Sequence, residues 1–88
     1  MKSIIIALLL INSAYASFPT KNDCLAIIEG SPSYMCDTKD CQYVLDGWAS
    51  YMCDSNDCKY IIDGRSSFMC ETNNCKFIID QWSSTMCE

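Results

Sequence analysis

The sequence predicts an all-α protein made of tandem short amphipathic helices, joined in disulfide-stapled antiparallel hairpins. Three observations predict this fold. Eight cysteines recur in two columns with a period of 17 residues. Within each period the apolar residues follow the i, i+3, i+4, i+7 spacing of a helix with one buried face. An aspartate or asparagine stands directly before the first cysteine of every period, where such residues cap helices.

Residues 1–16, MKSIIIALLLINSAYA, have the composition of a secretory signal peptide. Lys2 is followed by an apolar run over residues 4–11 and then by the small residues Ala14 and Ala16. This order of charged, apolar and small residues predicts cleavage after Ala16. The apolar run is too short to span a bilayer. We therefore expect a secreted, extracellular product that does not insert into a membrane after cleavage.

Residues 17–23 are expected to form a flexible lead-in, and residues 24–88 to form one small domain of four units. The units read CLAIIEGSPSYMC, CQYVLDGWASYMC, CKYIIDGRSSFMC and CKFIIDQWSSTMC, and the linkers between them read DTKD, DSND and ETNN. A chain of this size buries too little surface to be stable without cross-links. An even number of cysteines in a secreted chain therefore predicts disulfides. The cysteines are Cys24, Cys36, Cys41, Cys53, Cys58, Cys70, Cys75 and Cys87.

Each unit fits a helix that begins near its first cysteine. The buried stripe predicted for the second unit consists of Cys41, Val44, Leu45, Trp48, Ala49, Met52 and Cys53. The predicted N-caps of the four helices are Asp23, Asp40, Asp57 and Asn74. The linkers then become four-residue turns between antiparallel neighbours, a usual length for a helix connection.

A pair of short strands is the alternative for each unit, and it would give an all-β fold, either a small β-solenoid or an array of hairpins. In the third unit, residues 60–62 and 68–69 favour strands, and Asp63-Gly64 between them is a hairpin signal. The mid-unit glycines and Pro32 also disfavour a continuous helix. The helix is nevertheless preferred, because it buries the repeated apolar columns on one face and tolerates Gln81 in place of the glycine.

The two folds predict different disulfides. Antiparallel helical hairpins predict the bridges Cys24–Cys53, Cys36–Cys41, Cys58–Cys87 and Cys70–Cys75. Strand hairpins would close each unit on itself, through Cys24–Cys36, Cys41–Cys53, Cys58–Cys70 and Cys75–Cys87. A third scheme bridges the linkers alone and leaves Cys24 and Cys87 to join neighbouring molecules. A bridge across a loop of about 15 residues contributes about 3 kcal/mol, so disulfides supply much of the stability in either hairpin scheme.

Composition argues against several classes of function. The chain has 11 acidic and 6 basic residues, a net charge of −5, and no histidine. An acidic protein is poorly suited to nucleic acid and to anionic membrane surfaces. Without histidine the common general base and the usual serine or cysteine nucleophile arrangements are missing, so we expect no enzyme. No cofactor or metal is expected either, because C-x-x-C pairs and the glycine and closing glutamate of a calcium loop are lacking.

One column of the repeat holds candidate binding residues. Trp48, Arg65 and Trp82 share it with Ser31, and tryptophan and arginine are typical of binding hot spots. In an alternative interpretation this column faces the hairpin core in alternate units. The predicted function is a non-catalytic structural or binding module, whose partner is an unknown extracellular protein or a second copy of the chain. The alternative is a secreted effector or toxin-like ligand of a cell-surface protein.

The cysteines in every unit resemble those of insect ice-binding solenoids. Those proteins present ranks of threonine, or of tyrosine, on a flat face. Here Thr38 and Thr72 share a column with Ser55 and lie in linkers, so no threonine rank exists. Ice binding is therefore not expected.

Overall fold

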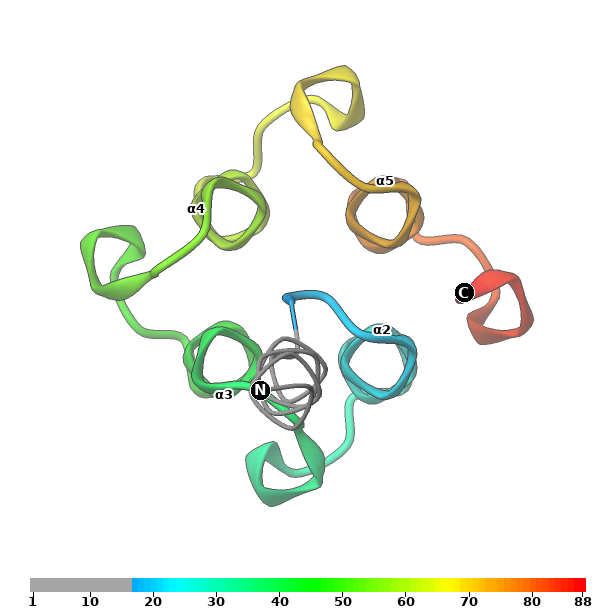
Figure 1. Ribbon diagram of the computed structural model, residues 1–88, viewed down its shortest axis with the longest axis horizontal. Coiled ribbons are helices and arrows are strands. Elements are labelled where there is room, and N and C mark those ends of the chain that lie inside the picture. Colours follow the sequence, from blue (N-terminus) through cyan, green and yellow to red (C-terminus); the bar gives the residue numbers. More distant parts are fainter. Residues whose placement is uncertain (1–16) are drawn as a thin grey trace, which may run out of the picture.

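Four short α-helices form a closed ring in the computed structural model, which describes residues 17–88 (Figure 1). The helices are α2 (Lys21–Glu29), α3 (Lys39–Asp46), α4 (Asn56–Asp63) and α5 (Asn73–Ile79). Each is followed by a 3-10 turn: η1 (Ser33–Met35), η2 (Ser50–Met52), η3 (Ser67–Met69) and η4 (Ser84–Met86). Each helix packs against the next, and α5 packs against α2. The predicted signal peptide, residues 1–16, lies outside the described residues.

The all-α prediction is confirmed, and the all-β alternative is wrong: residues 17–88 contain helices and turns but no strand. The predicted antiparallel hairpins, however, are replaced by another arrangement. In place of two hairpins the four units form one ring, and the 3-10 turns lie outside the ring of α-helices (Figure 1).

The α-helices begin earlier than predicted, because hydroxyl side chains cap them. The N-caps are Thr20, Thr38, Ser55 and Thr72, and each hydroxyl accepts a hydrogen bond from the third amide of its helix. The Thr38 Oγ1, for example, lies 3.2 Å from the amide nitrogen of Cys41. This satisfies an amide that has no partner inside the helix. The predicted cap Asp40 instead lies inside the first turn, and its side chain is used elsewhere.

The α-helices also end earlier than predicted, at a left-handed residue. In the second unit, Gly47 has a φ of 72°, its amide donates to the Val44 carbonyl at 3.3 Å, and the Trp48 amide donates to the Tyr43 carbonyl at 3.0 Å. This pair of bonds is a Schellman motif, which ends a helix at glycine. The helix therefore stops before Trp48, and the later residues of the predicted stripe belong to the outer segment. The glycine that was expected to weaken a helix interior is the residue that ends it.

All four α-helices point in the same direction. The Sγ of Cys41 lies 4.0 Å from the carbonyl oxygen of Asp23, so the first turn of α3 contacts the first turn of α2. The same contact recurs between α3 and α4, between α4 and α5, and between α5 and α2. Antiparallel helices about 12 Å long would place a first turn beside a last turn instead. After each glycine the chain returns outside the ring, so the next helix starts at the same end.

The disulfides follow from this parallel arrangement. Three bridge the linkers, Cys36–Cys41, Cys53–Cys58 and Cys70–Cys75, and the fourth joins Cys24 to Cys87. The predicted bridges Cys24–Cys53 and Cys58–Cys87 are therefore wrong, and so is the scheme that closes each unit on itself. Every bond joins the end of one unit to the start of the next, and the last unit is joined to the first. Cys24 and Cys87 pair with each other rather than with neighbouring molecules.

The core of the ring is small. The first cysteine of each unit is completely buried, at 0% exposure. Cys41 and Cys58 belong to one buried cluster and Cys24 to another. Ile27 and Ile61, from units on opposite sides of the ring, pack against both clusters. Phe18 is buried to 8% exposure in the first cluster. Part of the segment predicted as a lead-in therefore belongs to the packed structure, and α2 itself begins at Lys21.

Gln81 occupies in the last unit the left-handed position that glycine holds in the other three, with a φ of 59°. A side chain in this conformation costs roughly 1–2 kcal/mol. We expect Gln81→Gly to raise the free energy of unfolding by about 1 kcal/mol, because it removes this strain and the larger entropy that glycine loses on folding offsets only part of the gain. Urea denaturation of the oxidised protein measures this, and the converse change Gly47→Gln should lower the midpoint. If Gln81→Gly is less stable than the wild-type protein, then Gln81 is not strained by its left-handed conformation.

Candidate functional site

The predicted binding residues Trp48, Arg65 and Trp82 lie at equivalent places, just after the C-terminal ends of α3, α4 and α5. The structure does not gather them into one pocket. The helices α3 and α5 occupy opposite corners of the ring, with α4 between them (Figure 1). Trp48 and Trp82 are each 51% exposed, so this column does not form the interior of a hairpin.

Each tryptophan packs on the aromatic residue that lies five positions before it. The rings of Tyr43 and Trp48 meet edge to face with centroids 6.1 Å apart, and those of Phe77 and Trp82 meet in the same way at 6.3 Å. A contact between these two positions commonly accompanies a Schellman motif. One side of each indole thus supports the helix end, and the other side faces solvent.

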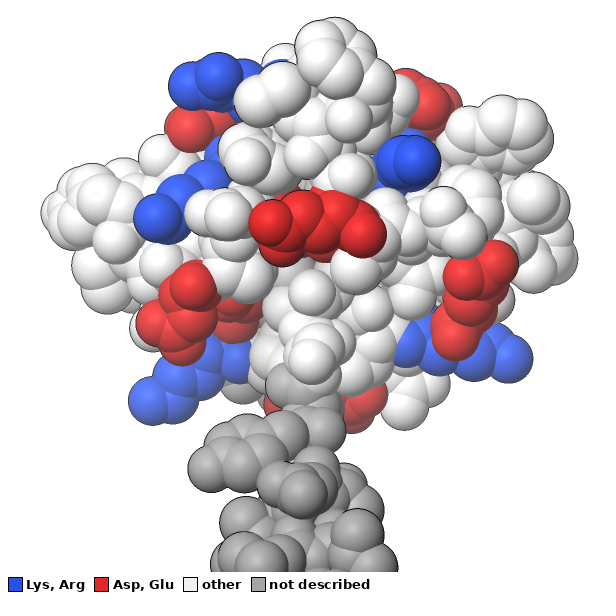
Figure 2. Space-filling model, turned by 45° about the horizontal axis from the view of Figure 1, so that its top comes forward, with Lys and Arg blue, Asp and Glu red and all other residues white. Residues whose placement is uncertain are grey.

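A second column of exposed aromatic side chains lies on the outer turns. Tyr34, Tyr51 and Phe68 are the middle residues of η1, η2 and η3, and they are 79–82% exposed. Figure 2 shows acidic and basic side chains interspersed on one face of the molecule, with uncharged residues between them. This face therefore has charges of both signs rather than one strongly charged patch.

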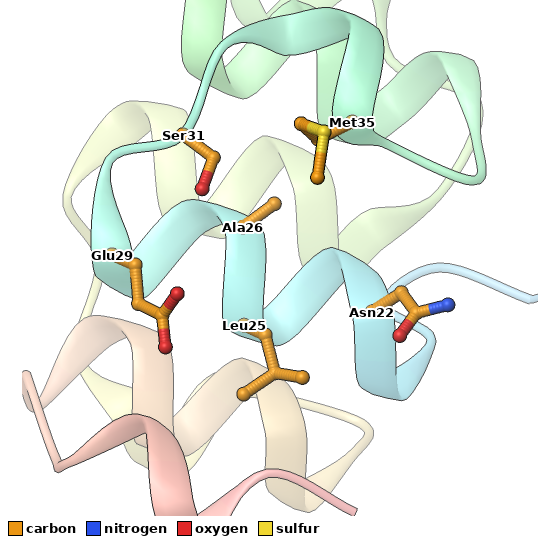
Figure 3. Close-up of a pocket in the computed structure, with 6 residues that line it drawn as sticks. All are labelled: Asn22, Leu25, Ala26, Glu29, Ser31 and Met35. Carbon is orange, nitrogen blue, oxygen red and sulfur yellow. The ribbon is translucent and has the colours of Figure 1, made fainter.

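The first unit contains a cavity of about 310 Å³, which we call the first-unit pocket (Figure 3). Its lining residues are Asn22, Leu25, Ala26, Glu29, Ser31 and Met35. The helix α2 supplies the floor through the buried Ala26, while Ser31 and Met35 approach from the segment that follows the helix. We did not predict this pocket from the sequence. The sequence does contain a signal for it. Ala26 stands in a column that is aromatic in the other units, and Ser31 stands in the column of tryptophan and arginine.

A second cavity, of about 410 Å³, is lined by Ile27, Ile28, Ile78 and Gln81. These residues come from the later turns of α2 and α5 and from the turn that ends α5. Three of these lining residues are isoleucines, and none of them is charged.

A buried carboxylate accompanies each linker disulfide. Asp23, for example, accepts hydrogen bonds from the Asp37 amide at 2.7 Å and from the Thr38 hydroxyl at 2.8 Å. Asp57 accepts from an amide and a hydroxyl of the third linker in the same way, whereas Asp40 accepts from two amides, those of Asp54 and Ser55. Each aspartate therefore orders the chain that leads into the next helix, which explains why the column repeats.

These carboxylates also form three groups that have the spacing of metal ligands. In each group one aspartate and two cysteines place their ligand atoms within 4.8 Å of one another, as Asp40, Cys53 and Cys58 do. The two sulfurs of each group are bonded to each other, and the carboxylate oxygens already accept hydrogen bonds. The chemistry of the oxidised groups is thus that of a structural support rather than of thiolate ligands.

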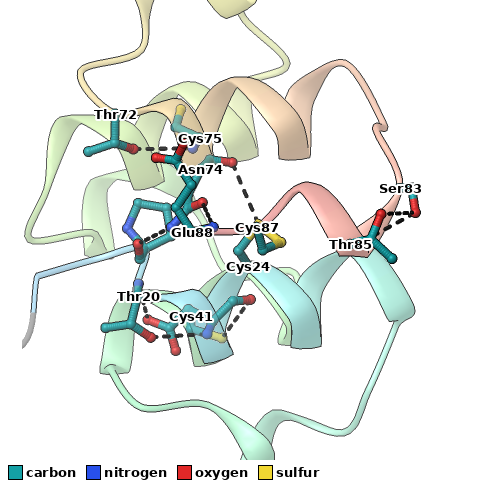
Figure 4. The surroundings of a disulfide bond; sticks show 12 residues. Thr20, Cys24, Cys41, Thr72, Asn74, Cys75, Ser83, Thr85, Cys87 and Glu88 are labelled. Atoms are coloured by element: carbon teal, nitrogen blue, oxygen red, sulfur yellow. Dashed lines mark hydrogen bonds between the residues drawn. A yellow bond between two sulfur atoms is a disulfide. The ribbon is translucent and has the colours of Figure 1, made fainter.

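The last unit differs from the other three at Asn74, where the ring closes (Figure 4). Its Oδ1 accepts from the Glu88 amide at 2.8 Å, as the aspartates do from their linkers. The aspartates accept a second hydrogen bond from their linkers, whereas the side chain of Asn74 lies beside the Pro19 carbonyl. The Asn74 Nδ2 donates to that carbonyl at 3.1 Å. An amide fits this place because it carries one acceptor and one donor group.

Within residues 17–88, no helix has the length and apolar composition needed to cross a membrane. Comparison with protein-family models, with curated proteins and with solved structures found no match to this chain.

Proposed function

We propose that the protein is a secreted, non-catalytic binding module that presents exposed aromatic side chains on a rigid ring to an extracellular protein. The observation that carries this proposal is the set of large apolar side chains that the ring exposes. These are Tyr34, Met35, Trp48, Tyr51, Phe68, Trp82 and Met86. Aromatic residues and methionine are enriched in protein–protein interfaces.

Rigidity supports the same proposal. The four disulfides tie every unit to its neighbours, so the outer turns hold their side chains in fixed places before any partner binds. A preorganised surface loses less entropy on binding. Four disulfides in a small chain also favour an oxidising, extracellular compartment, as the sequence of residues 1–16 does.

The test is a triple variant, Trp48→Ala with Arg65→Ala and Trp82→Ala. Because the two indoles pack on neighbouring rings, we expect a loss of about 1 kcal/mol for each removed aromatic pair, with the disulfide-bonded fold retained. A partner is first isolated from extracellular fluid by the wild-type protein, identified by mass spectrometry and purified. The triple variant should then bind this partner at least tenfold more weakly in a biosensor measurement, since hot-spot residues each contribute 2 kcal/mol or more.

The matched control changes one column of exposed side chains in the same three units, through Gln42→Ala, Lys59→Ala and Lys76→Ala. We expect this control to bind like the wild-type protein. Equal binding by the tryptophan–arginine variant would overturn the proposed surface. A partner identified as a cell-surface receptor would favour the effector function over a module in extracellular fluid.

A further inference from the structure

The first unit departs from the other three at positions that lie together in space. Leu25 stands where the others have glutamine or lysine, Ala26 where they have tyrosine or phenylalanine, and Glu29 where they have aspartate. Ser31 stands where they have tryptophan or arginine. All four departures line the first-unit pocket. In a repeat whose other columns vary little, this coincidence indicates a local role.

The backbone at the pocket is the same as in the other units. The Ser31 amide donates to the Ala26 carbonyl at 2.9 Å, as the Trp48 amide does to the Tyr43 carbonyl at 3.0 Å. Equivalent side chains therefore leave the helix end in equivalent directions. Two lining residues of the first-unit pocket, Ala26 and Ser31, therefore stand in the columns that hold an edge-to-face aromatic pair in the second and fourth units.

The lining of this pocket suits an aromatic ring. Ala26 forms a small buried floor, and Leu25 and the thioether of Met35 offer apolar contacts at its sides (Figure 3). Sulfur packs favourably against ring edges, and alkyl side chains pack against ring faces. The volume of about 310 Å³ is at the lower end of the range for small-molecule sites.

The charge at the pocket is negative. Glu29 is the last residue of α2, at the negative end of the helix dipole, and the last turn of this helix carries no basic residue. Its carboxylate is one methylene longer than the aspartates in the same column, and it lines the pocket. Ser31 and Asn22 add groups that donate and accept hydrogen bonds. A ligand carrying a cation is therefore favoured over a neutral or anionic one.

We propose that the first-unit pocket binds a small aromatic ammonium, with the ring against Ala26, Leu25 and Met35 and the ammonium group at the Glu29 carboxylate. The pocket shares Met35 with the exposed side chains described above, but the residues that test the partner surface, Trp48, Arg65 and Trp82, lie in the other three units. The two proposals can therefore fail independently.

The probe is tryptamine, added to the oxidised, ¹⁵N-labelled protein, with binding followed by amide chemical shifts. Saturable shifts are expected at the amides of α2 and Ser31. Indole-3-propionate has the ring with the opposite charge, and isoamylamine has the ammonium group without the ring. Both should bind at least tenfold more weakly, because each lacks one of the two contacts.

Two variants locate the site. The double change Ala26→Tyr with Ser31→Trp rebuilds the aromatic pair of the second unit, so it should fill the pocket and abolish the saturable shifts. Glu29→Gln lies on the surface and leaves the fold intact, and it should weaken tryptamine binding by about fivefold, the upper range for an exposed ion pair. The control Asp46→Asn removes the equivalent carboxylate of the second unit and should change nothing.

Several results would overturn the proposal. They are the absence of saturable shifts with millimolar tryptamine, equal binding of indole-3-propionate, or undiminished binding by the filled double variant. If the double variant does not fold, the comparison of Glu29→Gln with Asp46→Asn still tests the proposal. An equal change in tryptamine binding by these two variants would contradict binding at the first-unit pocket.

Discussion

Replacing Cys24 and Cys87 together by serine is expected to lower the free energy of unfolding by about 4 kcal/mol. This bond closes a loop with a sequence separation of 63 residues, and the stabilisation by a disulfide grows with the length of the loop it closes in the unfolded chain. The matched control, Cys53→Ser with Cys58→Ser, removes a bond whose cysteines have a sequence separation of 5. The same relation between loop length and stability predicts that it lowers the free energy of unfolding by about 2 kcal/mol. Denaturant unfolding of both variants, with their remaining disulfides oxidised, measures the difference.

Without the Cys24–Cys87 bond, the structure should open first at the interface between α2 and α5. The α2–α5 interface then depends on packing and on the hydrogen bonds of Asn74, so amide exchange should accelerate in α2 and α5 before α3 and α4. In the wild-type protein, cleavage after Lys21, Glu29 and Lys76 should leave the peptide containing Cys24 attached to the peptide containing Cys87. A Cys87 peptide attached to Cys58, or equal destabilisation by the two cysteine variants, would contradict the closed ring.

Asn74→Asp is expected to lower the free energy of unfolding by about 2–3 kcal/mol, although it restores the residue type of the other three units. The new carboxylate would place an acceptor oxygen against the Pro19 carbonyl and lose the donated hydrogen bond at a buried position. Leaving a buried acceptor without a donor costs roughly 1–3 kcal/mol, and more when the group is charged. Urea denaturation at neutral pH measures the change.

The opposite exchanges serve as controls for Asn74→Asp. Asp40→Asn should also destabilise the protein, because the amide nitrogen would face the Ser55 amide, another donor. Asp57→Asn should cost less, about 1 kcal/mol, because its partner is the Thr72 hydroxyl, which accepts as well as donates. If Asn74→Asp proves neutral while Asp40→Asn does not, then the Pro19 contact is not what selects asparagine in the last unit.

The sequence predicted the helices well but not their ends. The i, i+3, i+4 spacing of apolar residues found the core columns that contain Ile27, Val44, Ile61 and Ile78, which do face the interior. The predicted stripe was too long, because Trp48 and Met52 continue the same spacing by coincidence after the helix has stopped. Gly47 marks the end of the helix and is not a weak point in its interior. The hydroxyl caps stand close to aspartates or asparagine in the sequence, and both residue types favour the N-cap, so residue type alone does not separate them.

The candidate site was only partly predictable. The column of Trp48, Arg65 and Trp82 was identified from residue type alone, and its exposure could not be derived without knowing where the helix ends. The first-unit pocket was missed because it arises from absent side chains, at Ala26 and Ser31. A missing ring is informative only once the other units show what normally fills the place.

The sequence by itself determined the unit: its period, its helix and the need for cross-links in a small chain. These properties depend on residues within about one turn of each other, so a local pattern reveals them. Only the tertiary structure decided that the four helices are parallel and that Cys24 pairs with Cys87. Both depend on the path of the chain outside the ring, which returns each new helix to the same end. The four units together bring the end of the last unit beside the start of the first. This closure depends on all four units, so the sequence of one unit does not predict it.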